Sequence, residues 1–289
     1  MVTSHLHCAG TENQLPRISV VTAAYGPTAT FLSDTIESVK AQALPPGWEL
    51  EWVVQEDGPG PFLATKFDGV DFVRYEANEA QLGLAMTRNL ALSRVTGDLV
   101  QVLDHDDVLL PDAFTTLIPR FATSSIHWAI GQADDLLPDG SRASFSSMLD
   151  HGVVPAGRVN EWAADNGGNW PVHCAGLMMR TATLRALGGW AASPADDDLA
   201  MFAALSEVVD GYNDPALTWL YRQHPNQTHK KQSWNSWSSV GRRIALQRAA
   251  AVRAAGLFAA TSNASSVDGA AVEPPELGKL IPKENYPGR

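Results

Sequence analysis

The chain has 289 residues, of which 45% are hydrophobic and 18% charged, so it has enough apolar side chains for a sizeable core. Its formal net charge of -11 argues against a general nucleic-acid binder, because phosphate contacts need clustered lysine and arginine. The two cysteines, Cys8 and Cys174, form no disulfide framework and fit a reducing compartment. The start lacks a signal-peptide pattern and no apolar run could span a bilayer, so we expect a soluble, cytoplasmic protein without a transmembrane segment.

Strands and helices alternate through the first half of the chain. Apolar, β-branched runs predict buried strands, and apolar residues at helical spacing predict helices between them. The predicted strands are 18–26, 50–56, 70–77 and 98–107, and the predicted helices are 28–42, 83–97 and 111–122. Gly97 is expected at the C-terminal end of the second helix. This alternation implies parallel crossover units and an α/β fold with a Rossmann-like, mostly parallel central sheet flanked by helices.

The second half of the chain is less regular. Its pattern predicts a hairpin at 127–145, a loop rich in Gly, Asn and Trp at 159–176, a strand and short helix at 177–190, a helix at 196–208, a strand and basic loop at 216–234, and an Ala- and Arg-rich helix at 238–258. We expect residues 1–16 to be a flexible lead-in and 261–289 a loose tail, because neither stretch has apolar periodicity.

Four ionisable residues, Asp104, His105, Asp106 and Asp107, follow the fourth predicted strand. Clustered carboxylates repel one another unless a cation or hydrogen-bond donors offset their charge. One interpretation is a turn that caps the next helix, although a single Asp would suffice for that. The other is a hard divalent cation held by Asp104 and Asp106, which the strand period points the same way, with water and substrate phosphates completing its shell. An EF-hand fits worse, because Leu109 stands where that loop needs glycine.

A second acidic group opens the stretch ADDDLAMFAAL, residues 195–205. These carboxylates either cap a helix and favour its dipole, or include a general base, Asp197 or Asp198. A neighbouring carboxylate raises the proton affinity of its partner, which helps a base to work near neutral pH. The spacing does not choose between the two interpretations.

The loop after the last predicted strand carries histidines and cations. His224 or His229 is either an ordinary surface residue, a metal ligand or a donor to a phosphate. Lys230, Lys231 and Arg222 would supply the local positive charge that a diphosphate needs in an acidic protein.

Asp57, Arg88 and Asn89 are individually weak signals. Asp57 is followed by glycine, a pair that usually marks only a turn, and Arg88 lies on a predicted helix, where arginine is usually solvated. Trp162 and Trp170 are either core residues or a platform for a sugar or ring on the acceptor side.

Taken together, the motifs resemble a known family. The run ISVVTAAYG, the turn VVQEDGPG, the segment GLAMTRNLAL, the run GDLVQVLDHDD with Pro111 after it, and the later GGW and ADDDLAMFAAL follow in the order and spacing of family 2 glycosyltransferases, which have the GT-A fold. The resemblance covers roughly residues 17–230. It implies a glycosyltransferase domain over that range, with a nucleotide-sugar half at 17–110, an acceptor and catalytic half at 111–230, and a C-terminal helical extension at 231–260.

The resemblance also implies roles for the donor side. Thr22 and Ala24 would line the nucleobase pocket, Asp57 would accept a hydrogen bond from the base, and Arg88 would face the nucleotide. Lys230 would add positive charge near the diphosphate. The donor is expected to be a UDP- or dTDP-sugar, by frequency in the family.

The same resemblance assigns the metal and the base. Asp104 and Asp106 would be the Asp-x-Asp pair that holds Mn²⁺ or Mg²⁺, and His224 would complete the metal shell. Asp197 and Asp198 would stand in for a Glu-Asp pair, with Asp198 favoured as the base of an inverting transfer to an acceptor hydroxyl. The acceptor is expected to be soluble, and a homodimer through the Ala-rich helix near Trp234 and Trp237 is one option.

Departures from the family pattern keep alternatives open. Glu56 and Pro59 replace residues of the family's Asp-Asp-Gly-Ser turn, Asp197 replaces Glu, and Ala204 replaces an Arg. They lend weight to a GT-A module that binds a nucleotide sugar without turnover. A sugar nucleotidyltransferase is a further alternative, although its Gly-rich basic signature is absent after the first strand. A haloacid-dehalogenase-type phosphatase fits less well, because its Asp-x-Asp has a different context.

Overall fold

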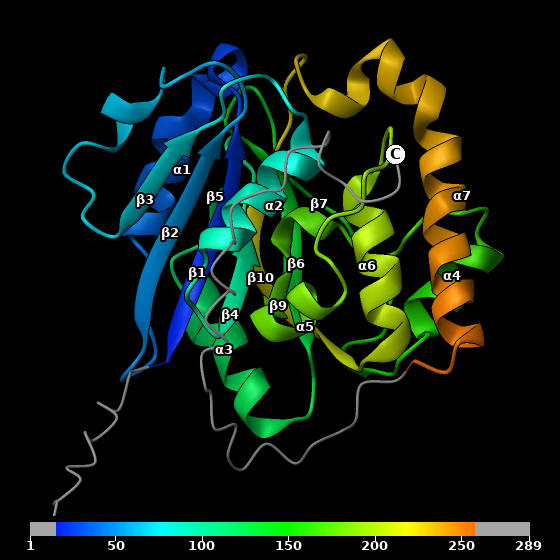
Figure 1. The fold of residues 1–289 in the computed structure, drawn as a ribbon. Helices are drawn as coiled ribbons and strands as arrows, with labels where there is room; N and C mark the ends of the chain where they lie inside the picture. The colour runs from blue at the N-terminus through cyan, green and yellow to red at the C-terminus, as the bar shows by residue number, and fades with distance from the viewer. Residues whose placement is uncertain (1–15, 258–289) are drawn as a thin grey trace, which may run out of the picture.

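The first strand, β1 (Arg17–Ala24), lies within a mixed sheet in the computed structural model, which describes residues 16–257 (Figure 1). The strand order is β3-β2-β1-β4-β9-β6-β10-β5, with β7 paired to β6 and β8 to β10. The other strands are β2 (Glu49–Glu56), β3 (Val73–Ala77), β4 (Leu99–Val102), β5 (Val108–Leu109), β6 (Trp128–Leu136), β7 (Arg142–Ser144), β8 (Gly152–Val154), β9 (Met178–Arg180) and β10 (Gly211–Arg222). Strands β3, β2, β1, β4, β6 and β10 run in one direction, and the short β9 is antiparallel between β4 and β6. The expected mostly parallel α/β sheet is therefore confirmed.

Helices cover both faces of the sheet. They are α1 (Leu32–Lys40), α2 (Leu84–Arg94), α3 (Ala113–Thr123), α4 (Arg158–Asp165), α5 (Thr181–Ala186), α6 (Asp197–Val208) and α7 (Gln232–Ala254), with short 3-10 helices η1 (Gly26–Phe31), η2 (Ala64–Phe67), η3 (Cys174–Gly176) and η4 (Thr228–Lys230). Strand side chains alternate between faces: Ile18 and Val20 pack into the core under α1 and α3, whereas Val21 packs into the core under α2, α5 and α6. The central strands lie between these two cores and bury side chains on both faces, which explains the long apolar runs in the sequence.

The parallel direction of the strands decides where the site lies. The residues that follow β1, β2, β4 and β10 emerge at the same edge of the sheet, because these strands share one direction. Tyr25, Asp57, the stretch 103–107 and His224 are therefore brought to one end of the molecule.

Helix α6 is buried on nearly all sides. The sheet lies on one side of it, and α7 runs alongside it on the other (Figure 1). Gly241 makes this approach possible, because a Cβ atom there would lie 2.2 Å from the carbonyl oxygen of Ala195. The N-terminal end of α6, with its three aspartates, is thereby held beside the first turns of α7.

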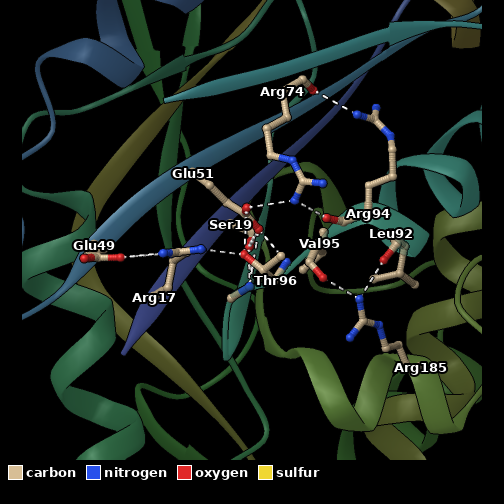
Figure 2. A network of polar contacts seen from close by, with 11 residues as sticks. Arg17, Ser19, Glu49, Glu51, Arg74, Leu92, Arg94, Val95, Thr96 and Arg185 are labelled. Atoms are coloured by element: carbon tan, nitrogen blue, oxygen red, sulfur yellow. Dashed lines mark hydrogen bonds and ion pairs between the residues drawn. The ribbon is translucent and has the colours of Figure 1, made fainter. Parts of the chain in front are cut away.

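A buried carboxylate ties together the opposite end of the sheet, as Figure 2 shows. Glu51 is 5% exposed and accepts hydrogen bonds from Ser19 Oγ (2.5 Å), from the Thr96 backbone N–H (2.6 Å) and hydroxyl (2.8 Å), and from Arg74 (3.3 Å). Burial alone would raise the pKa of Glu51, but these hydrogen bonds lower it below its usual value. The network joins β1, β2, β3 and the segment before β4, far from the edge where the site lies.

Several local predictions need correction. Gly97 does not end α2, which stops at Arg94; a Cβ at Gly97 would lie 2.4 Å from Ser19 Oγ, so the glycine serves close packing. The predicted loop at 159–176 contains α4, because Val159 and Ala163 share one buried face. Helix α7 begins at Gln232 rather than at 238.

The expected hairpin is confirmed by the antiparallel pairing of β6 with β7. The expected tail at 261–289 and all but the last residue of the lead-in at 1–16 lie outside the described residues. Within residues 16–257, no helix has the length and apolarity needed to cross a membrane.

Candidate active site

A cavity of about 770 Å³ opens at the carboxyl ends of the parallel strands. Segments far apart in the sequence contribute its walls: the ends of β1, β2 and β4, the first turns of α2 and α6, the end of β10, and the start of α7. Its size suits a small-molecule or cofactor ligand. Of the residues predicted to act at a site, it brings together Ala24, Asp57, Arg88, Asp104, Asp106, Asp197 and Asp198.

Arg88 joins the two acidic groups. It is 2% exposed, and its guanidinium lies 2.6 Å from Asp104 Oδ1 and 3.4 Å from Asp197 Oδ2. Burial would lower the pKa of Arg88, but Asp104, Asp197 and Asp198 raise it above its usual value. A buried guanidinium that stays charged therefore fixes the position of β4's acidic loop relative to α6.

Asp106 is oriented from behind by a histidine. His224 Nε2 lies 2.8 Å from Asp106 Oδ2, and His224 is 8% exposed and does not line the cavity. Asp106 Oδ1 has no hydrogen bond to any described residue. In this arrangement His224 holds the carboxylate, and its role as a metal ligand stays a prediction.

Asp107 and Arg222 hold the acidic loop from the inside. Asp107 is fully buried and accepts the backbone N–H of Arg222 at 2.9 Å, while Arg222 Nε donates to the carbonyl of Asp106 at 2.7 Å and its Nη2 contacts Asp34. Burial and then the charges of Asp106 and Asp104 raise the pKa of Asp107 well above its usual value. Arg222 thus stabilises the loop and is not one of the cations that line the cavity.

Asp57 has a structural task at the mouth of the cavity. Its carboxylate accepts the backbone N–H groups of Leu82 (2.6 Å) and Gly83 (3.1 Å) and the side-chain amide of Asn78 (3.2 Å). These bonds fix the loop that leads into α2. Oδ1 accepts two of these bonds and Oδ2 accepts one, so Oδ2 retains acceptor capacity toward a ligand.

The three aspartates at the start of α6 have different surroundings. Asp196, in the left-handed region (φ 53°), accepts a hydrogen bond from Ser238 Oγ at 2.7 Å and so ties α6 to α7. Asp197 is 3% exposed and faces Arg88; burial raises its pKa, Arg88 opposes the rise and Asp198 adds to it, for a value of about 7. Asp198 is less buried, and only the Leu199 N–H donates to it among the described residues. Asp198 is the carboxylate of the three best placed to meet a ligand.

Besides His224 and Arg222, four predicted site residues lie away from the cavity. Thr22 is fully buried, and its hydroxyl donates to the Leu103 carbonyl and accepts from Trp52. Lys230 turns toward Gln223 and the His224 carbonyl. Trp170 is buried in the core, where its indole donates to Asn160, and Trp162 packs against the same core from α4. Of the two interpretations, core residues fit better than an acceptor-side platform, because neither side chain lines the cavity.

Two residues of the predicted basic loop, His229 and Lys231, also line the cavity. Other lining residues were assigned no donor or acceptor contact from the sequence: Tyr25, Thr28, His105, His173, Tyr221, Trp234, Ser238 and Arg242. His173, Tyr221 and His229 form one cluster: the rings of His173 and Tyr221 lie 4.3 Å apart, and the Tyr221 hydroxyl lies 3.1 Å from His229 Nδ1. Trp234, near the helix suggested above as a dimer contact, lines the cavity, and the dimer stays a prediction. The sequence pattern indicated the loop rich in Gly, Asn and Trp at 159–176 and the basic loop after the last predicted strand. It did not show which of their side chains point into the cavity.

The charge of the cavity bears on whether a metal fits. Six aspartates line it, against three lysine or arginine side chains, and one of those three, Arg88, is already neutralised by Asp104 and Asp197. No group of three or more His, Cys, Asp or Glu within the described part of the chain is arranged as a ready metal site. The donors that face the cavity, Asp104 and Asp106, nevertheless have the oxygen chemistry of a Mg²⁺ or Mn²⁺ site that takes its remaining ligands from water and substrate phosphates.

The comparison with family models identifies the N-terminal half of the fold. Residues 19–147, which run from β1 through β7, match the model described as Glycosyl transferase family 2. This segment belongs to family 2. The glycosyltransferase segment contains Asp57, Arg88 and the Asp104–Asp107 loop, whereas α6 and α7 lie outside the matched residues.

Two curated proteins resemble the family 2 segment in sequence. One is an uncharacterized protein, y4gI, of Sinorhizobium fredii, 33% identical over 106 residues, or 36% of this chain and 12% of the relative. The other is a glucosyl-dolichyl phosphate glucuronosyltransferase of Haloferax volcanii, 29% identical over 119 residues, or 40% of this chain and 37% of the relative. The match thus spans well under half the length of each relative.

Solved structures extend the likeness beyond the family 2 segment. Residues 1–349 of S. aureus TarS in complex with UDP-GlcNAc superpose with a TM-score of 0.58 at 15% identity, over 73% of this chain and 60% of that one. The complex of the same protein with UDP gives 0.57 at 15% identity, over 72% and 61%. At this identity the likeness concerns the fold, which is of the GT-A type.

Proposed function

We propose that the chain is a metal-dependent, inverting glycosyltransferase that moves a sugar from a nucleoside-diphosphate donor to an acceptor hydroxyl. One observation supports this best: the oxygen donors Asp104 and Asp106 and the carboxylate of Asp198 line a single cavity at the carboxyl ends of the parallel strands. The membership of residues 19–147 in family 2 and the UDP and UDP-GlcNAc complexes of a structural neighbour agree with it.

On the donor side, Ala24 at the end of β1 and Asp57 after β2 line the cavity, and we assign the nucleobase to this wall. A diphosphate in this cavity would meet more carboxylates than cations, so it needs a compensating cation. Asp106, with Asp104 beside it, would hold Mn²⁺ or Mg²⁺, which when bound neutralises the diphosphate and makes it a better leaving group. We assign Arg88 the role of fixing Asp104 rather than that of contacting phosphate.

On the acceptor side, Asp198 is the proposed general base. It takes the proton of the acceptor hydroxyl as the hydroxyl oxygen forms a bond to the anomeric carbon. The bond from that carbon to the diphosphate oxygen breaks on the opposite face, and its electron pair leaves with the nucleoside diphosphate. One displacement inverts the configuration. Asp197, held by Arg88, positions the start of α6.

The proposed catalytic unit includes α7. Residues 17–230 were expected to hold the whole domain, but Lys231, Trp234 and Ser238 line the cavity beyond that boundary. We therefore propose that the C-terminal helix is one wall of the site.

Release of nucleoside diphosphate tests the proposal. The protein is incubated with UDP-, dTDP- and GDP-sugars and Mn²⁺, and the products are separated. Nucleoside diphosphate released from one donor class is expected. Pyrophosphate would instead indicate a nucleotidyltransferase, and metal-dependent donor binding without release would indicate a module that binds without turnover.

A further inference from the structure

A second hollow adjoins the proposed active site. This groove of about 450 Å³, the α4–α7 groove, lies between the C-terminal end of α4 and the middle of α7. Its walls include Gly168, Ser239, Arg243 and Leu246, and it shares Ser238 and Arg242 with the main cavity. The two hollows therefore meet along one face of α7. Residues three or four positions apart on this face line the main cavity at one end and the α4–α7 groove at the other.

The α4–α7 groove is electrostatically the opposite of the main cavity. Two arginines line it, and none of its described lining residues is Asp or Glu. Arg243 is exposed and has no hydrogen bond or ion pair to any described residue. Arg242 is fixed in place by a hydrogen bond to Asn169, with its Nε 3.7 Å from Asp196 Oδ2. An uncompensated guanidinium beside a fixed one forms a place for an oxyanion in a chain whose net charge is -11.

The groove also lies on the correct side of the proposed reaction. Ser238, on its shared wall, donates to Asp196 at 2.7 Å, and Asp196 precedes the proposed base Asp198 by two residues. Arg243 does not line the main cavity, where the donor diphosphate is placed. A molecule that presents a hydroxyl to Asp198 can therefore extend along α7 into the groove.

We propose that the α4–α7 groove binds a phosphate carried by the acceptor, so that the substrate is a phosphate-bearing alcohol rather than a neutral one. This inference rests on the proposed transfer reaction for the acceptor's role, but the anion site itself can be measured without turnover. Arg243 supplies the main charge-assisted contact, Arg242 the second, and the Ser239 hydroxyl a further donor.

Calorimetric titration with inorganic phosphate tests the site, in protein saturated with UDP and Mg²⁺ so that the donor position is filled. Arg243→Gln should weaken phosphate binding about tenfold, the usual effect of losing a hydrogen bond to a charged group. The matched control is Arg142→Gln, an exposed arginine of β7 without a described side-chain partner, which should bind as the wild type does. Acetate should bind more weakly than phosphate, because two arginines match a doubly charged anion.

Equal phosphate affinity of wild type and Arg243→Gln, or no phosphate binding by the wild type, would overturn the inference. Tighter binding of acetate than of phosphate would overturn the choice of phosphate. UDP is titrated separately into the wild type in the presence of Mg²⁺ and then of Mn²⁺. If UDP binds in neither titration, the proposed donor site is contradicted. Phosphate is then titrated without UDP, so that a failure of the donor site is distinguished from a failure of the phosphate site.

Discussion

At the scale of single residues, three aspartates in sequence have three different tasks. Asp196 binds α7, Asp197 binds Arg88, and Asp198 is left to face the cavity. Chemical type and spacing are the same for all three, so only their surroundings separate a structural carboxylate from a proposed base. The same holds for Asp104, Asp106 and Asp107, of which the last is fully buried.

Asp198→Asn should therefore lower transfer by roughly 10²–10⁴-fold, the usual contribution of a general base. UDP binding should be retained, because the amide keeps the size of the side chain. Initial rates of nucleoside-diphosphate release and a parallel UDP titration measure the two effects. Asp165→Asn, on the exposed end of α4, is the control. Transfer by Asp198→Asn at the wild-type rate would remove the base from the proposal.

Glu51 provides a prediction on stability and its pH dependence. Its pKa is lowered in the folded state, so its ionised form stabilises the fold above the unfolded pKa of about 4.3, and this contribution is lost as the pH falls through the folded value. Glu51→Gln should cost about 1–3 kcal/mol near pH 7 and flatten the loss of stability in acid.

Denaturant unfolding at several pH values measures both effects. Glu79→Gln, an exposed residue without a described partner, should change neither. A Glu51→Gln protein that loses stability in acid as steeply as the wild type would show that the network in Figure 2 does not depend on the charge.

At the scale of elements, the packing of α7 on α6 decides the shape of the site. Gly241→Ala would place a methyl group 2.2 Å from the Ala195 carbonyl, which is backbone and cannot turn aside. We expect a loss of about 1–3 kcal/mol, typical of overpacking, together with reduced transfer as α7 moves away from Asp196 and Asp198.

Thermal unfolding and initial rates test this together. Gln247→Ala on the exposed side of the same helix should stay within about 0.5 kcal/mol of the wild type. If Gly241→Ala unfolded at the wild-type temperature, the close approach of the two helices would be unimportant.

Element-level prediction from the sequence succeeded where periodicity carried the signal. The parallel strands and the residues at their carboxyl ends followed from apolar runs broken by Asp57 and by the Asp104–Asp107 cluster. It failed where orientation depends on distant partners: Lys230 and Lys231 are adjacent, but only Lys231 lines the cavity. Trp170 appeared to lie in an open loop because nothing local shows that Asn160 receives its indole N–H.

At the scale of the whole molecule, the fold places opposite charges in adjoining hollows. The main cavity is acidic and needs a cation for any diphosphate, whereas the α4–α7 groove has its own arginines. The sequence shows the acidic motifs but not this division, because α4 and α7 meet only through tertiary packing. The Arg88 link between β4 and α6 was hidden for the same reason.

The central claim is that the acidic cavity binds a nucleoside diphosphate through a divalent cation, and calorimetric titration of UDP tests it most directly. With Mn²⁺ the wild type should bind UDP, and with EDTA the affinity should fall at least about tenfold, since the carboxylates then repel the diphosphate. Asp106→Asn should weaken binding in Mn²⁺, whereas Asp165→Asn should not. UDP binding of equal strength in EDTA and in Mn²⁺ would contradict the account.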